Sequence, residues 1–273
     1  MFAWAAARLG RFTGRALRLV AKETKARLQD LTAQDLSVLV WSFARSGTED
    51  TQDTERSRAA AGAGMLNTLT SSVMRLLREL TPQDLSTIIW GYATAGVEAT
   101  SMIEAVANES VKKVAKFAPQ DMANVAWGLA KLGLLHEQLL EVLSRDFVAR
   151  AHECQAQHLS IAAWSFAKLG VASEELFEAI ARSLANRAAE LDPQGIGNSL
   201  WAFGVLCFWH PPCVKAVGRR AVTAVNELTV QEMANVAFGL HTLLRWRRPG
   251  KCCLLGVRRD LFQSLIGQCV LGF

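Results

Sequence analysis

The chain has 273 residues, a net charge of +5 at pH 7 and a hydrophobic content of 51%. That content is ample for a packed core, and no apolar run reaches the ~18 residues that a membrane-spanning helix needs. The sequence therefore predicts a protein without membrane association. Length alone allows one or two domains.

The N-terminal segment, residues 1–30, is basic, with seven Lys/Arg against two acids. Its cations recur at steps of three and four: Arg8, Arg11, Arg15, Arg18 and Lys22. This pattern has two interpretations. A mitochondrial transit peptide has such a composition, but Trp4 lies 37 residues before Trp41, in step with the repeats described next. We expect a basic helical segment that is a partial repeat.

Residues 31–244 contain six related segments of 14 residues, each beginning with glutamine. They are QDLSVLVWSFARSG (34–47), QDLSTIIWGYATAG (83–96), QDMANVAWGLAKLG (120–133), QHLSIAAWSFAKLG (157–170), QGIGNSLWAFGVLC (194–207) and QEMANVAFGLHTLL (231–244). The first step is 49 residues and the other four are 37. A fixed interval of this size is typical of a stacked repeat array. Below, positions 1 to 14 are counted from the glutamine.

The longer first step is explained by a polar insertion near residues 48–60. Its sequence TEDTQDTERSR (48–58) is charged and poor in apolar residues. Connections between repeats tolerate such insertions. We expect a solvated loop here.

Helix start and stop signals surround each segment. Thr81, Pro82 and Asp84 form the pattern of a capping box with proline at the first helical position. The pairs Thr32/Asp35 and Thr229/Glu232 repeat it, and Asp192-Pro193 is a variant. Glycines stand where a left-handed residue would end the helix, at Gly47, Gly96, Gly133 and Gly170.

Each 14-residue segment predicts an amphipathic helix, because positions 3, 6, 7 and 10 fall on one side at 3.6 residues per turn. A second helical pattern follows, as in 137–151 and 174–190. Such a hairpin buries its apolar faces only by stacking on its neighbours. We therefore predict an all-α protein, an α-solenoid of stacked helix hairpins with a 37-residue repeat.

The C-terminal segment, residues 245–273, is basic and then apolar. Six Lys/Arg stand against one acid over 245–260, whereas residues 31–244 hold 17 against 22. Gln268 falls 37 residues after Gln231, so we expect the repeat to continue here. Because the array itself is net acidic, any nucleic-acid affinity has to come from a local positive surface or from the basic ends.

The sequence lacks an arrangement typical of catalysis. The five histidines share no common spacing, no CxxC pair occurs among the six cysteines, and neither a phosphate-binding glycine loop nor a Ser/His/Asp pattern is present. We expect reduced, mostly buried thiols, no metal, no cofactor and no enzymatic activity.

The repeats resemble the octotricopeptide and heptatricopeptide repeats of organellar proteins. The shared core is Q-x-L-[AS]-N-x-x-W-[AGS]-[FL]-A-[KR]-L-G, clearest in 120–133 and 157–170. Similar segments occur in the leucine-rich region of FAST-kinase-domain-containing proteins. The resemblance implies binding to mitochondrial or plastid transcripts and rRNA, with effects on processing, stability or translation. It favours the mitochondrial matrix, with the plastid as the alternative.

The candidate RNA contacts lie at positions 5 and 12, which share the polar side of the helix and vary between copies. They are predicted to line a concave face: Arg45, Thr87, Thr94, Asn124, Lys131, Lys168, Asn198, Asn235 and Thr242. Asparagine can pair with a base edge and cations can neutralise phosphates, as in other one-base-per-repeat proteins. The small residue at position 9 would let a nucleotide approach.

Several alternatives stay open. Varied polar positions are also what a solvated surface shows, and the groove of a protein-interaction scaffold could hold a peptide or a helix instead of single-stranded RNA. The tryptophans at position 8 either pack between repeats or stack partly on bases. The glutamine at position 1 is expected to tie one repeat to the next.

Overall fold

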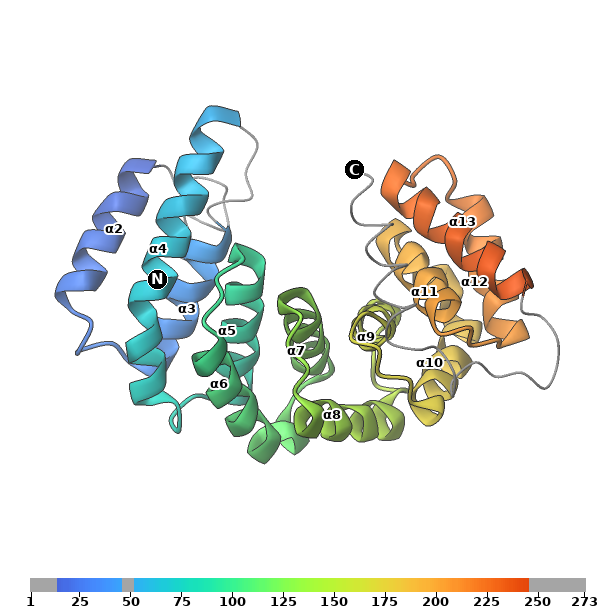
Figure 1. The fold of residues 1–273 in the computed structure, drawn as a ribbon, viewed down its shortest axis with the longest axis horizontal. Helices are drawn as coiled ribbons and strands as arrows, with labels where there is room; N and C mark the ends of the chain where they lie inside the picture. Colours follow the sequence, from blue (N-terminus) through green and yellow to red (C-terminus); the bar gives the residue numbers. More distant parts are fainter. Residues whose placement is uncertain (1–13, 46–51, 246–273) are drawn as a thin grey trace. The chain divides into compact units, whose positions relative to one another are not determined.

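The computed structural model describes residues 14–45 and 52–245, and these form α-helices and two short 310 helices with no β-strand among them (Figure 1). The all-α prediction is confirmed. The chain divides into two compact units, residues 1–143 and 144–273, and each is described by itself. The predicted features at Trp4, Gly47 and Gln268 lie outside the described residues.

The first unit is built from helix hairpins. It contains α2 (Gly14–Ala26), α3 (Ala33–Arg45), α4 (Gln52–Leu76), α5 (Pro82–Ala95), α6 (Thr100–Lys113), the 310 helix η1 (Val114–Lys116), α7 (Pro119–Leu132) and the part of α8 (Glu137–Arg150) up to Leu143. Helices α3, α5 and α7, the first helices of their repeats, pack side by side in one layer (Figure 1). Each of α3 and α5 also packs against the helix that follows it.

The second unit repeats this arrangement. After the remainder of α8 it contains α9 (Ala156–Lys168), α10 (Glu174–Arg187), the 310 helix η2 (Ala188–Glu190), α11 (Pro193–Val205), α12 (Pro211–Thr223) and α13 (Val230–Arg245). The first helices α9, α11 and α13 form one layer, and the second helices α10 and α12 pack together beside it. Each unit is therefore a stack of helix hairpins, as expected of an α-solenoid.

The predicted helix boundaries are found where the structure describes them. Asp84 accepts hydrogen bonds from the Thr81 backbone N–H (2.9 Å) and hydroxyl (2.7 Å), and the Asp84 N–H donates to the Thr81 hydroxyl. Thr32/Asp35 and Thr229/Glu232 form the same reciprocal pair, and Asp192 caps α11. Left-handed glycines end three of the segments, namely Gly96, Gly133 and Gly170, and Cys207 adopts φ 52° at the same position.

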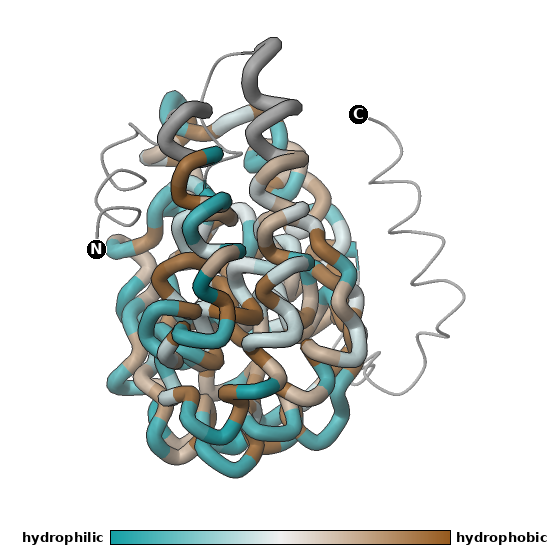
Figure 2. The backbone as a smooth tube through the Cα atoms, turned by 90° about the vertical axis from the view of Figure 1, so that its left-hand side faces the viewer, coloured by the Kyte–Doolittle hydropathy of each residue, from teal (hydrophilic) through white to brown (hydrophobic). Residues whose placement is uncertain are grey.

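The predicted apolar stripe forms the core. Met122, Val125, Ala126 and Leu129, at positions 3, 6, 7 and 10 of α7, are fully buried. Figure 2 shows hydrophobic and hydrophilic residues alternating around the turns of individual helices, as amphipathic helices require. The stripe is less covered in α13, where Met233 at position 3 is 41% exposed.

Position 9 is where neighbouring first helices touch most closely. A Cβ atom added to Gly91 would lie 2.4 Å from the Val40 side chain, and one added to Gly239 would lie 2.2 Å from the Leu200 carbonyl oxygen. The equivalent Ser42 and Ser165 are fully buried. The small residue at position 9 therefore packs against position 7 of the preceding repeat. The expectation that it admits a nucleotide is wrong.

From Gln52 onwards the polar insertion is helical and not the solvated loop that its composition suggested. Helix α4 begins at Gln52 and runs for 25 residues. Residues 52–58 contain neither proline nor glycine, and charged side chains are compatible with solvated helical turns. The extra residues thus lengthen the second helix of their repeat.

Cations near the ends of second helices bind the connection that precedes the first helix of their own hairpin. Lys113 Nζ donates to the carbonyls of Arg78 (3.0 Å) and Leu80 (2.8 Å). Arg187 donates to the Cys154 carbonyl, and Arg220 to the Leu191 carbonyl at 3.1 Å. These basic side chains satisfy backbone acceptors between consecutive repeats, so their role is structural.

The close contact at position 9 predicts the effect of a single methyl group. Gly239→Ala should lower the free energy of unfolding by at least ~2 kcal/mol, because its Cβ meets backbone atoms that cannot turn away. Gly218→Ala is the matched control: its Cβ meets nothing within 4 Å in α12, so it should stabilise the protein by about 0.5 to 1 kcal/mol. Urea denaturation followed by circular dichroism measures both changes. Equal stabilities of the two variants would contradict the packing described.

Candidate nucleic-acid interface

Positions 1, 5, 8 and 12 form one row along each first helix, within about 60° of arc at 3.6 residues per turn. Because positions 3, 6, 7 and 10 face the core, this row lies on the opposite side. Its residues are accordingly accessible. The glutamines at position 1 are exposed in all six copies and the aromatic residues at position 8 are partly exposed in all six. We call this surface the outer row.

Most of the predicted contact residues lie on the outer row with accessible side chains. Arg45 and Lys131 are exposed, and the other candidates are partly exposed: Thr87, Thr94, Asn124, Lys168, Asn198, Asn235 and Thr242. The first unit holds the candidates up to Lys131, and the second unit holds those from Lys168 onwards. Within each unit the candidates therefore occupy equivalent sites on adjacent helices.

The two threonines at position 12 differ from the prediction in their hydroxyl groups. The Thr94 oxygen is buried and has no hydrogen-bond partner among the described residues. The Thr242 hydroxyl donates to the Phe238 carbonyl of its own helix at 2.9 Å. Neither hydroxyl is therefore available to a ligand in the way that a lysine or arginine side chain at position 12 would be. Sequence position alone does not show which way a short side chain turns.

The outer row carries no carboxylate at positions 1, 5, 8 or 12 in any of the six copies. The four acids of the first helices all stand at position 2: Asp35, Asp84, Asp121 and Glu232. Each accepts a hydrogen bond at the start of its helix, where it complements the helix dipole. The net acidity of residues 31–244 is therefore kept off this surface.

The hydrogen bond that joins two repeats does not come from the glutamine at position 1, from which it was expected. The glutamines are exposed, and the side-chain hydrogen bond of Gln231 is local, from its Nε2 to Asn235 Oδ1 at 3.2 Å. Instead, Ser86 at position 4 of α5 donates to Asp121 Oδ1 of α7 at 2.7 Å. Ser86 and Asp121 lie beside the contact between α5 and α7, so a short side chain is long enough to bridge the two helices. The glutamine recurs on the outer row as an exposed residue in all six copies.

The aromatic residues at position 8 are both packed and accessible. The Trp164 and Trp201 rings of adjacent helices have centroids 6.4 Å apart at an interplanar angle of 38°. The Arg45 guanidinium lies 5.3 Å from the Trp41 ring centroid, within cation–π range. Sequence reasoning did not include these rings among the site residues, although their recurrence at one position was the signal for them.

A shallow depression on the second helices is a weaker candidate. It is lined by residues of α8, of the turn after it and of α10, and these include His152, Arg182 and Arg187. However, Arg182 pairs with Glu178 at 2.7 Å and Arg187 with Glu190 at 2.7 Å. Both arginines are thus already paired with carboxylates of their own helix or of the turn that follows it.

Histidine and cysteine side chains serve local structure. His136 Nδ1 and His210 Nδ1 accept backbone N–H groups at the starts of α8 and α12, each at 3.2 Å. Burial raises the pKa of Cys154 to about 11 and that of Cys213 to about 12. Within the described ranges no three His, Cys, Asp or Glu side chains gather as metal ligands.

None of the helices in the described residues is both long and apolar enough to cross a bilayer. A comparison with curated proteins found no match. Residues 55–255, which include five of the six glutamine-led segments, match the family described as RNA-editing substrate-binding complex 6 protein. The match extends over more than half of the sequence. The chain therefore belongs to the RNA-editing substrate-binding complex 6 protein family.

Proposed function

We propose that this protein binds single-stranded RNA without catalysing a reaction, and that the outer row is its contact surface. The observation that carries the proposal is the charge arrangement of that row. Lysine and arginine occur at position 12, amides at positions 1 and 5, and no carboxylate stands among them. A polyanion could approach this surface despite the net acidity of the array.

The two variable positions would have different roles. Arg45, Lys131 and Lys168 would neutralise phosphates and release counterions, a contribution that depends on salt but not on base sequence. Asn124, Asn198 and Asn235 would pair with base edges through both amide atoms. Because each repeat would contact one base, the order of the repeats along the chain would set the order in which bases are contacted.

The family supports a place in RNA processing, since its description names a substrate-binding complex of RNA editing. We propose that the chain holds the RNA on which other components of such a complex act. We propose that this activity takes place in the mitochondrial matrix, with the plastid as the alternative, and the resemblance to octotricopeptide repeats supports an organellar location. Effects on transcript stability or translation would follow from occupancy of the same RNA.

A protein-interaction scaffold is the second candidate function. It is favoured by exposed apolar side chains at one end of the second unit: Val222 is 74% exposed, Val230 66% and Leu244 55%. Exposed apolar side chains on the last two described helices are available for contacts with another protein. The two functions are compatible, because these residues are not on the outer row.

Charge reversal tests the RNA proposal. Lys131→Glu combined with Lys168→Glu should weaken binding to single-stranded RNA by about 10- to 100-fold and reduce the salt dependence of the association constant by about 1.4 in log–log slope. Fluorescence anisotropy over a salt series measures both. Lys116→Glu with Lys215→Glu is the matched control, since each replaces one exposed lysine per unit away from the first helices. If both double variants lose affinity equally, the outer row is not the contact surface.

The buried thiols test the non-catalytic part of the proposal. Because the pKa values of Cys154 and Cys213 are raised to about 11 and about 12, both thiols are protonated at pH 8, and the thiolate that reacts is scarce. Iodoacetamide at pH 8 should leave both unmodified in the folded protein and modify both in denaturant. Peptide mass spectrometry measures this. Rapid modification of either thiol in the folded protein would contradict the proposal, because it would show a reactive thiolate.

A further inference from the structure

We propose that the aromatic side chains at position 8 are stacking platforms for unpaired bases, one per repeat. The platforms are Trp41, Trp90, Trp127, Trp164, Trp201 and Phe238. This inference rests on the proposed function and deepens it. It assigns the ligand as RNA whose bases are free to leave their stack.

Burial separates these rings from the aromatic residues that fill the core. At position 10, Phe166 and Phe203 are fully buried. At position 8, two residues earlier along the same helices, Trp164 and Trp201 stay partly exposed. Tryptophan is large and seldom buried completely, but here all six rings at position 8 belong to residues that keep part of their surface accessible. Tryptophan on a surface instead offers a large flat face with a polar edge.

The neighbours of each ring suit a nucleotide. Positions 5 and 12 lie three residues before and four residues after position 8, so they flank it on the same helix face. On α7 the sequence of the row is Asn124, Trp127 and Lys131. A base on the indole would have an amide one turn away in one direction and an ammonium one turn away in the other. The same helix would thus supply stacking, edge contact and phosphate neutralisation.

The spacing of the rings favours a single strand over a duplex. The Trp164 and Trp201 centroids are 6.4 Å apart, whereas successive bases in a stacked strand rise by about 3.4 Å. Bases on adjacent platforms therefore cannot be stacked directly on one another. A duplex keeps its bases stacked and its faces covered, while a single strand can splay them onto protein rings.

The first test uses the unmodified protein and three probes of about 12 nucleotides: oligouridylate, a ribose-phosphate oligomer of equal length without bases, and an RNA duplex. Oligouridylate should bind at least ~10-fold more tightly than either other probe, and it alone should quench tryptophan fluorescence. If the base-free oligomer binds as tightly as oligouridylate, the rings are not stacking platforms, and the proposed function stays intact. If no probe binds, the proposed function itself fails. Equal binding of the duplex would also overturn this inference.

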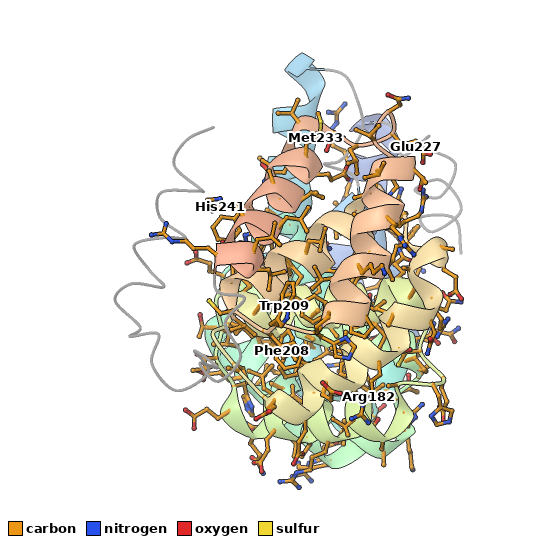
Figure 3. The ribbon with its side chains drawn as sticks, turned by 90° about the vertical axis from the view of Figure 1, so that its right-hand side faces the viewer. Arg182, Phe208, Trp209, Glu227, Met233 and His241 are labelled. Carbon is orange, nitrogen blue, oxygen red and sulfur yellow. The ribbon has the colours of Figure 1, made fainter. Side chains whose placement is uncertain are left out.

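The second test separates stacking from structure. Trp164→Leu with Trp201→Leu should lower oligouridylate affinity by at least ~30-fold, since each platform contributes about 5- to 150-fold, while affinity for the base-free oligomer stays unchanged. Trp209→Leu is the control. Trp209 is partly exposed but lies in the connection between α11 and α12 (Figure 3).

The deciding quantity is the ratio of the affinity for oligouridylate to the affinity for the base-free oligomer. A tryptophan pair that only supports the fold would change binding of both oligomers together and leave their ratio unaltered, which would overturn the proposal. Replacement of both by phenylalanine preserves most of the packing and a smaller stacking face. That variant should fold and show an intermediate ratio, so a poorly folded leucine variant does not prevent the test.

Discussion

The contact between first helices at positions 7 and 9 is the constraint on which the rest of each unit depends. The backbone at Leu200 leaves no space for a Cβ at Gly239, and Gly128 has the same relation to Ile89. Contacts this close fix the rotation of each helix relative to its neighbour. Once the rotation is fixed, position 5 of one repeat and position 5 of the next occupy equivalent places. The outer row is therefore a consequence of packing on the adjacent side of the helix.

Charge is divided among three locations with different tasks. Carboxylates at position 2 cap first helices, and in Asp121 the same carboxylate also joins two repeats through Ser86. Cations at the ends of second helices, such as Lys113, bind backbone carbonyls. The cations of position 12, Arg45, Lys131 and Lys168, form the third group, on the outer row. Because the carboxylates of the first helices stand at position 2, the outer row itself carries no negative side chain despite the net acidity of the array.

Much of this organisation could be predicted from the sequence because it is local. Capping pairs, left-handed glycines and the apolar stripe depend on residues within a few positions of one another. The side of the helix on which positions 5 and 12 lie follows from helical geometry alone. By contrast, the burial of the Thr94 hydroxyl does not follow from its position in the segment. The helical state of residues 52–58 also escaped prediction, because a charged segment without proline or glycine is compatible with either a loop or a helix.

The glutamine and the tryptophan illustrate how recurrence can be misattributed. Both recur at fixed positions, which suggested packing, yet the six glutamines are exposed and the aromatic rings are only partly buried. Recurrence shows that a position has the same task in each repeat, and exposure shows that the task involves the solvent side. Position 5 behaves differently, since it holds asparagine in three repeats and Val38 or Ile161 in others. An apolar side chain cannot hydrogen-bond a base edge. If the rings hold the bases, a repeat with asparagine at position 5 would select among bases, whereas a repeat with Val38 or Ile161 would accept any base. Affinity would then come from position 8 and selectivity from position 5 of the same helix face.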